Sequence, residues 1–175
     1  VIYYRIFINS ALANIYFPQK KFKVTNPVFL PSSKKISVAE IQQAKIIKYA
    51  DFILNGYVYY YSHNKQLVGE NPDWFFNPFN NKIFKGFSKH WTKLNDFNKE
   101  SGDIKNFWEI SRFNWVGTLI QAYTITLDKK YLERTNEWIL DWSKKNQPNT
   151  GPNWKCGQEA SIRVLNLIIA QEILG

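Results

Sequence analysis

Three long segments with helical periodicity follow one another toward the C-terminal end of the sequence, and they constrain the fold more than any other feature. They are residues 104–127, 129–145 and 158–174. In the second, Trp138 and Trp142 lie four residues apart and therefore share one helical face. The third carries an apolar stripe and is apolar nearly all round in its middle, which predicts a buried helix. Short breaks between long helices favour antiparallel helical hairpins, so we predict a mostly α fold.

Capping and turn residues set the expected limits of the helices. Asp128 is a suitable N-cap for the second long helix, and residues 146–151 form a suitable break after it. Upstream, Ser37 and Glu40 form a capping-box pattern ahead of an apolar periodicity. This pattern predicts a helix over residues 38–54.

The stretch between that helix and the first long one has no clear periodicity. Aromatic and β-branched residues at 57–61 predict a short strand. Residues 62–102 form a long irregular region rich in Asn, Pro and aromatic side chains. Its aromatic density favours packing over a surface rather than disorder. Residues 18–36 have the composition of a connector, so we divide the chain into a basic segment at 1–36 and a helical domain at 37–175.

Composition excludes several classes of protein. A chain of 175 residues with 45% hydrophobic and 17% aromatic content has material for one packed domain. No run approaches the roughly 20 apolar residues of a membrane-spanning helix. The single cysteine, Cys156, excludes an intrachain disulfide, and the two histidines, His63 and His90, exclude a multi-histidine metal site. The chain has no methionine and begins with Val1, so we expect a processed or truncated product.

The net charge of +9 is unevenly distributed. Residues 1–50 contain eight Lys or Arg and a single acidic residue, Glu40, so +7 of the charge lies in this region. A basic region of this kind can bind nucleic acid, an anionic membrane surface or an acidic polysaccharide. Scattered lysines are also common on an ordinary solvated face, and the sequence leaves these alternatives open.

Trp108, Arg112 and Trp115 follow the i, i+4, i+7 spacing in the first long helix, so we expect them to form one stripe. Two indole rings can stack on sugar faces, and a guanidinium can form a bidentate pair with a carboxylate or sulfate. The stripe therefore suits carbohydrate recognition. The alternative, which the stripe alone favours, is that both Trp residues lie in the core above an Arg112 paired with Glu109.

A second candidate cluster begins the last helix. Asn153 and Trp154 lie in a Gly- and Pro-rich turn that can present an amide and an indole at the rim of a cleft. Glu159 and Arg163 stand four residues apart, so on a helix they can form an ion pair. The alternative is an ordinary helix start with a surface ion pair. His90 can act as a base, although a lone histidine is more often a hydrogen-bonded structural residue.

Several short motifs follow one another along residues 71–174. They are Asn71-Pro72 with Phe76-Asn77-Pro78, His90 through Asn95, Gly102 through Lys105, Trp108-Glu109 with Arg112, Trp142 through Asn146, and Asn153-Trp154 through Glu159 and Arg163. In order and spacing these motifs resemble the N-terminal helical region of the heparinase II/III family of polysaccharide lyases. Residues 1–70 match that region much less clearly.

The resemblance implies an incomplete α/α toroid, built from antiparallel helical hairpins around a long groove and truncated in this chain. It implies a bacterial protein that is periplasmic or secreted. The implied reaction is β-elimination on a uronic-acid polysaccharide of the heparan or alginate type. One group neutralises the uronate carboxyl, a Tyr or His base removes the C5 proton, and an acid assists departure of the C4 oxygen. No cofactor or metal is implied, since an amide or Arg can do the neutralising.

In that family the catalytic Asn-His pair, the Tyr and the second His lie downstream of the segment that matches Asn153 through Arg163. No catalytic residue can therefore be carried over, and we expect this chain alone to be inactive. The resemblance implies sugar contacts for Trp108, Arg112, Asn153 and Trp154, and structural support of the cleft for Glu109, Glu159 and Arg163. The expected partner is an acidic polysaccharide, and nucleic acid is not expected. A non-catalytic carbohydrate-binding or structural module and a basic nucleic-acid or membrane-surface binder remain alternatives.

Overall fold

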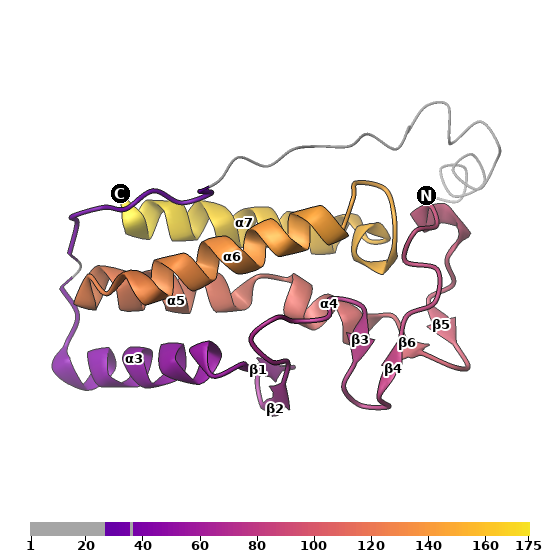
Figure 1. Ribbon diagram of the computed structural model, residues 1–175, viewed down its shortest axis with the longest axis horizontal. Coiled ribbons are helices and arrows are strands. Elements are labelled where there is room, and N and C mark those ends of the chain that lie inside the picture. Colours follow the sequence, from indigo (N-terminus) through magenta and orange to yellow (C-terminus); the bar gives the residue numbers. More distant parts are fainter. Residues whose placement is uncertain (1–26, 36) are drawn as a thin grey trace.

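Helices provide most of the regular structure in the computed structural model, which describes residues 27–35 and 37–175 (Figure 1). With the labels of Figure 1, the helices are α3 (Glu40–Leu54), α4 (Lys105–Ser111), α5 (Asn114–Thr126), α6 (Lys129–Lys145) and α7 (Gly157–Leu174). The strands are β1 (Tyr57–Tyr60), β2 (Asn64–Leu67), β3 (Phe76–Asn77), β4 (Lys82–Ile83), β5 (Phe97–Asn98) and β6 (Gly102–Asp103). Two 3-10 turns, η1 (Trp91–Lys93) and η2 (Pro152–Trp154), complete the regular elements. The prediction of a mostly α fold is confirmed.

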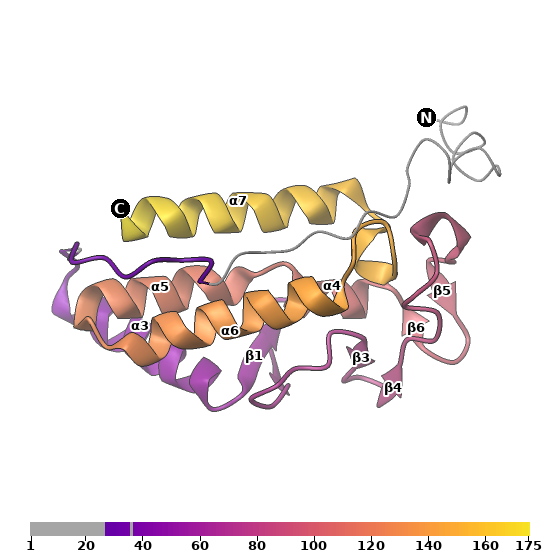
Figure 2. The same ribbon diagram turned by 45° about the horizontal axis from the view of Figure 1, so that its top comes forward.

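Helix α5 lies at the centre of the helical part and contacts α3, α6 and α7 (Figures 1 and 2). Its side chains are apolar on nearly every face, and most of them are fully buried. Helices α5 and α6 run in opposite directions and form an antiparallel hairpin, and α7 then returns along α5. The larger hydrophobic core fills the space between these four helices and includes Trp74, Trp115, Trp138 and Trp142.

The described part of the N-terminal segment is fastened to this core. Phe29 is 3% exposed, and its backbone N–H and carbonyl both bind the amide of Asn136 in α6, at 2.7 and 3.0 Å. Further along, the hydroxyl of Tyr123 in α5 donates to the carbonyl of Ser32 at 2.9 Å. Residues 27–35 thus pack against the helical domain. The rest of the basic segment predicted at 1–36 lies outside the described residues.

Three two-stranded antiparallel hairpins pair β1 with β2, β3 with β4 and β5 with β6. Strand β1 confirms the strand predicted at 57–61, whereas the other five strands show that the region predicted to be irregular at 62–102 contains short regular elements. Phe75 and Phe84, beside the β3–β4 hairpin, pack with Phe107 and Trp108 of α4 in a second, smaller core, whereas Val58 and Tyr60 of β1 belong to the larger core. Trp74, Phe75 and Phe84 are therefore packed, as the sequence predicts, whereas Phe79, Phe87 and Phe97 are 44–66% exposed.

Four predictions about the helices are wrong in detail. The helix predicted at 104–127 is broken after Arg112, because Phe113 takes a left-handed conformation with φ of 65° and inserts its ring among Trp115 and Trp142. The Trp115 indole then donates to the carbonyl of Ile110 at 3.0 Å, which satisfies an acceptor at the end of α4.

The second and third errors concern the start of α3. The helix begins at Glu40 rather than 38, and its N-cap is Ala39, whose carbonyl accepts the N–H groups of Gln42 and Gln43. Ser37 is therefore not a capping residue. By contrast, the N-cap role of Asp128 is confirmed, because its side chain accepts the Lys130 N–H at 3.1 Å.

The fourth error concerns α7, whose middle is not buried. One face packs on α5, and the opposite face leaves Val164, Leu165, Ile168 and Ile169 between 52% and 56% exposed. The buried face carries the polar residues Glu159 and Arg163. Within the described ranges, the helices lack the length and apolarity needed to cross a membrane.

Candidate functional site

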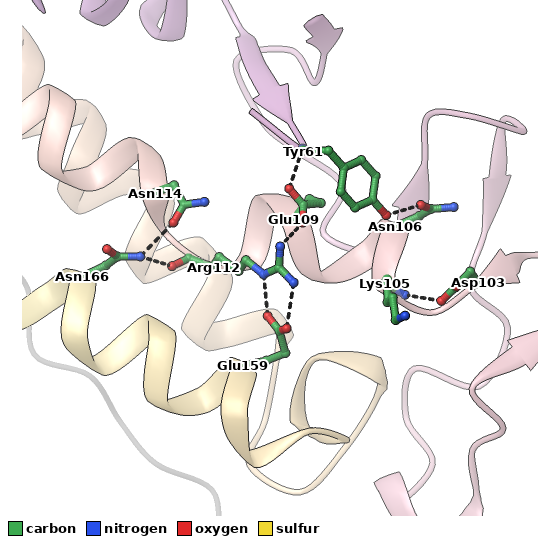
Figure 3. A network of polar contacts seen from close by, with 9 residues as sticks. All are labelled: Tyr61, Asp103, Lys105, Asn106, Glu109, Arg112, Asn114, Glu159 and Asn166. Atoms are coloured by element: carbon green, nitrogen blue, oxygen red, sulfur yellow. Dashed lines mark hydrogen bonds and ion pairs between the residues drawn. The ribbon is translucent and has the colours of Figure 1, made fainter. Parts of the chain in front are cut away.

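A buried guanidinium–carboxylate cluster lies where α4 ends and α5 begins (Figure 3). Arg112 donates from Nε to Glu159 Oε2 at 2.7 Å and from Nη2 to Glu159 Oε1 at 2.8 Å. Its Nη1 donates to Glu109 Oε1. The side chains of Glu109 and Glu159 are 3% and 5% exposed, whereas that of Arg112 is 24% exposed. The hydrogen bonds to Glu159 raise the pKa of Arg112 above its ordinary value, so the guanidinium stays charged.

The cluster joins elements that are distant in the sequence. The second oxygen of Glu109 accepts the backbone N–H of Tyr61, just after β1, at 2.7 Å. Asn166 of α7 donates to the carbonyl of Arg112 at 2.7 Å. Arg112 therefore holds the β1–β2 hairpin, α4 and α7 together. Because Glu159 already fills its bidentate fork, the guanidinium is not free to clasp a sugar carboxylate or sulfate in the same way.

The predicted stripe of Trp108, Arg112 and Trp115 is wrong, because the break between α4 and α5 separates the two indoles. Trp108 and Trp115 are 8% and 3% exposed. The Trp108 indole donates to the carbonyl of Pro152 at 2.8 Å. Both rings belong to the core and Arg112 pairs with Glu109, as the alternative interpretation of the stripe predicts.

Arg163 occupies an aromatic enclosure instead of pairing with Glu159. Its guanidinium carbon lies 5.0 Å from the ring centroid of Trp142 and 5.3 Å from that of Trp154. Its Nη2 donates to the carbonyl of Asn153 at 2.6 Å. Burial lowers the pKa of Arg163 to about 10, and the nearby charge of Glu159 partly opposes this shift. The predicted surface ion pair is wrong on both counts: the two residues are buried, and Glu159 hydrogen-bonds to Arg112 instead.

Asn153 and Trp154 fasten the turn before α7 to the end of α6. The amide of Asn153 is fully buried and donates to Asn146 Oδ1 at 2.8 Å, while the Trp154 indole donates to the Asn146 carbonyl at 3.0 Å. The structure thus brings all seven candidate residues into one region, where Trp108 and Asn153 are interior and Arg112 and Trp154 are partly exposed. The sugar-contact roles of these four residues stay predictions.

The strand predicted at 57–61 is present as β1, but the sequence analysis did not identify the surface that this strand contributes to the region. The hairpin alternates, so that Val58 and Tyr60 are buried while Tyr59 and Tyr61 are 42% and 37% exposed. The Tyr61 hydroxyl donates to Asn106 Oδ1 at 2.6 Å beside the cluster (Figure 3). Period-two alternation along a strand was the signal that could have identified these outward-facing rings.

Two phenols near Glu109, those of Tyr60 and Tyr61, hold their protons more tightly than a free tyrosine. Burial raises the pKa of Tyr60 far above its ordinary value, and burial followed by the charge of Glu109 raises that of Tyr61. His90 is 3% exposed, and its Nδ1 lies 2.8 Å from the hydroxyl of Thr92. Within residues 27–35 and 37–175, no group of three or more His, Cys, Asp or Glu side chains is arranged to hold a metal ion.

Comparisons with protein-family models, with curated proteins and with solved structures find no match to this chain.

Proposed function

We propose that this chain is the N-terminal helical part of a polysaccharide lyase that acts by β-elimination on a uronic-acid polysaccharide. In this proposal α5, α6 and α7 belong to an incomplete α/α toroid, in which helical hairpins surround a groove for the polymer. The chain supplies scaffold and polymer-binding surface, while the catalytic Asn, His and Tyr belong to the downstream part of such a lyase.

One observation carries the proposal: the motifs of the lyase resemblance pack on one another. Trp108 binds Pro152, Arg112 binds Glu159, and Asn153 binds Asn146, across separations of 44, 47 and 7 residues. In the same region, Asn77 donates to the carbonyl of Ser101 at 2.8 Å. Residues from separate motifs thus form one framework, and this framework supports a shared scaffold role for the motifs.

The proton-transfer groups support a division of labour between scaffold and catalysis. Removal of a C5 proton requires a base whose pKa lies near the working pH. The raised pKa values of Tyr60 and Tyr61 move both phenols away from that condition. The carboxylates of Glu109 and Glu159 both accept hydrogen bonds from the guanidinium of Arg112, so neither is free to act on a bound sugar. We therefore expect binding of polymer without elimination.

Ultraviolet absorbance of the unsaturated product, measured with heparan sulfate and with alginate, tests this division. We expect no product from the chain of 175 residues, and retardation of the same chain in gels that contain either polymer. A neutral polymer such as dextran is the control and should cause no retardation. Robust elimination by the chain alone would overturn the assignment of catalysis to downstream residues.

A non-catalytic carbohydrate-binding module is the second candidate, and the exposed rings of Tyr59, Tyr61 and Phe79 favour it. The two candidates differ in the parent protein, because only the lyase carries the downstream Asn-His, Tyr and second His. Reading the coding sequence beyond Gly175 separates them.

A nucleic-acid or membrane-surface binder is the further alternative. Of the basic residues at 1–50, only Lys34, Lys35, Lys45 and Lys48 lie in the described part of the chain, and the ammonium of Lys34 donates to the carbonyl of Glu172 at 2.9 Å. A steep salt dependence of DNA binding would support this alternative.

A further inference from the structure

Four aromatic side chains form a continuous cluster on the surface between α3 and the β1–β2 hairpin. Phe52 lies at its centre, with the rings of Tyr57 and Tyr59 both stacked against it at 5.1 Å between centroids. Tyr49 packs against Tyr59 at 5.5 Å and against Phe52 at 5.8 Å. The alternation of β1 turns Tyr57 and Tyr59 to this side and buries Val58 on the other.

Lysine side chains surround the cluster. The Lys65 ammonium, from β2, lies 4.0 Å from the ring centroid of Tyr57 and 5.0 Å from that of Phe52. Lys45 and Lys48 are exposed on α3, each four residues before a ring of the cluster, so they share its helical face. We call this set of residues the α3–hairpin surface: Lys45, Lys48, Tyr49, Phe52, Tyr57, Tyr59 and Lys65.

The nearest acidic residue of α3 is engaged elsewhere. Asp51 accepts the hydroxyl proton of Tyr131 at 2.8 Å and lies 3.7 Å from the ammonium of Lys130, both in α6. Its carboxylate is therefore engaged by α6. The α3–hairpin surface thus keeps the Lys65 ammonium over its rings, with Lys45 and Lys48 exposed on the same face of α3.

We propose that the α3–hairpin surface binds an acidic polysaccharide through ammonium and phenol groups, and this inference rests on the proposed function. Lys45, Lys48 and Lys65 would pair with carboxylates along the polymer, since ammonium groups are compact charges suited to flexible anionic chains. The phenol hydroxyls can both donate to and accept from sugar hydroxyls. The surface is separate from the Arg112 cluster, whose charges are paired internally.

The stacking within the cluster favours a polysaccharide over a single-stranded nucleic acid. Nucleic-acid bases need open ring faces on which to stack. Here Phe52 has two rings stacked against it, and Lys65 lies over the rings of Phe52 and Tyr57. Tyr59 is 42% exposed and Lys45, Lys48 and Lys65 are exposed, so a phenol and ammonium groups remain accessible to a carboxylated, hydroxyl-rich chain.

Binding of alginate oligosaccharides to the full chain, measured by calorimetry, tests the inference with two variants. The double change Lys48→Ala and Lys65→Ala removes charge, and Tyr57→Phe with Tyr59→Phe removes only two hydroxyls and keeps the packing. We expect each double variant to weaken binding about tenfold, from two exposed polar contacts of under about 1 kcal/mol each. Lys82→Ala with Lys144→Ala removes the same charge from exposed sites elsewhere and should change affinity about twofold or less.

The outcomes separate this inference from the proposed function. If the unmodified chain binds alginate and both double variants bind it equally well, the α3–hairpin surface is not the site, while the proposed function stands. If the unmodified chain binds no acidic polysaccharide, the proposed function fails and this inference with it. If the variants lose affinity for single-stranded DNA and not for alginate, the assigned ligand class is wrong.

Discussion

The Arg112 cluster shows how a single residue can hold distant segments in place. Two glutamates that are almost fully buried, Glu109 and Glu159, depend on one guanidinium for compensation of their charge. An ion pair of this kind adds little stability compared with well-packed apolar side chains, but breaking it is costly because the remaining charges lose their partner. The partnership therefore specifies which faces of α4 and α7 meet.

Replacement of Arg112 should be among the most damaging single changes in the chain. We expect Arg112→Ala to lower the free energy of unfolding by about 2–4 kcal/mol, a value moderated by the partly exposed edge of the guanidinium. Arg112→Lys keeps the charge but loses the fork and should lie between Arg112→Ala and the unmodified chain. Urea unfolding measures the effect. Lys85→Ala, at a highly exposed pair with Glu100, is the control and should change stability little. Equal stability of Arg112→Ala and the unmodified chain would contradict the prediction.

Tyr60 should make stability depend on alkaline pH. Burial is the main reason that its pKa lies above the ordinary value of 10.0, so the folded chain keeps a phenol proton that the unfolded chain loses. Its contribution is complete below about pH 10.0 and is lost as the pH rises further. Unfolding measured between neutral and alkaline pH should show a steeper decline for the unmodified chain than for Tyr60→Phe.

Arg163 changes the stability in the opposite direction over the same alkaline pH range. Its pKa is lowered to about 10, so its contribution to stability increases as the pH rises from there toward 12.5. The comparison with Tyr60→Phe isolates the tyrosine, because Arg163 is present in both proteins. Parallel pH profiles for the two proteins would show that Tyr60 ionises normally in the folded chain.

At the scale of elements, left-handed residues decide where α4 and α5 end. Phe113 and Leu127 both have positive φ, at 65° and 58°, although neither is glycine. The ring of Phe113 is 2% exposed, and its burial compensates for the backbone cost. Leu127 is 37% exposed and gains less from its side chain. Burial of the side chain therefore compensates less for the left-handed conformation of Leu127 than for that of Phe113.

Leu127→Gly should stabilise the protein. Glycine adopts the left-handed conformation without steric cost, and this position is the usual glycine site after a helix. We expect a net gain of roughly 0.5 kcal/mol, because relief of about 1 kcal/mol of strain is partly offset by lost burial. The melting temperatures of Leu127→Gly and Leu127→Ala should be compared, because the alanine variant loses most of the side chain and keeps the backbone strain. If the two variants melt together, strain at Leu127 is negligible.

At the scale of the whole molecule, two hydrophobic cores are joined by polar contacts. The larger core lies between α3, α5, α6 and α7 and includes Val58 and Tyr60 of β1, and the smaller one lies between α4 and the segment 75–104. The Arg112 cluster and the bond from Trp108 to Pro152 cross between the two regions. These connections predict that the hairpin region does not open independently of the helices.

Hydrogen exchange followed by mass spectrometry tests this coupling. The backbone N–H of Phe84 binds the carbonyl of Phe75 at 2.8 Å, and that of Ile104 binds Asp96 at 2.9 Å, so both report on the smaller core. We expect them to exchange with opening free energies within about 1 kcal/mol of the amides of α5. In Arg112→Ala the hairpin amides should exchange faster than those of α5. Fast exchange of the hairpin region in the unmodified chain would show two independent units.

The part of the structure that sequence reasoning predicted is the part with local causes. Helix α6 spans the expected residues, because its apolar period and the Asp128 cap are both encoded within a few positions of one another. The capping role predicted for Ser37 was wrong, although it was also based on a local pattern. The carbonyl of Ala39 accepts the first N–H groups of α3, and the helix begins without a side-chain cap.

The sequence identified which residues gather at the candidate site, but it did not identify which of them contact one another. Trp108, Arg112, Asn153 and Trp154 do gather in one region with Glu109, Glu159 and Arg163, but spacing along a helix misassigned the partners. Glu159 lies four residues from Arg163 and 47 from Arg112, yet it binds Arg112. Rules of helical spacing describe exposed pairs, and here each buried charge takes whichever partner the packing of other helices presents.

The sequence by itself determined that the chain is mostly helical and where α6 and α7 lie, because periodicity and caps act over a few residues. Only the tertiary structure decided which face of α7 is buried. Val164 and Ile168 are as apolar as any core residue, yet they remain half exposed while Glu159 and Arg163 turn inward. Burial of those two groups is favourable only beside Arg112 and the carbonyl of Asn153, and their positions follow from packing between helices distant in the sequence.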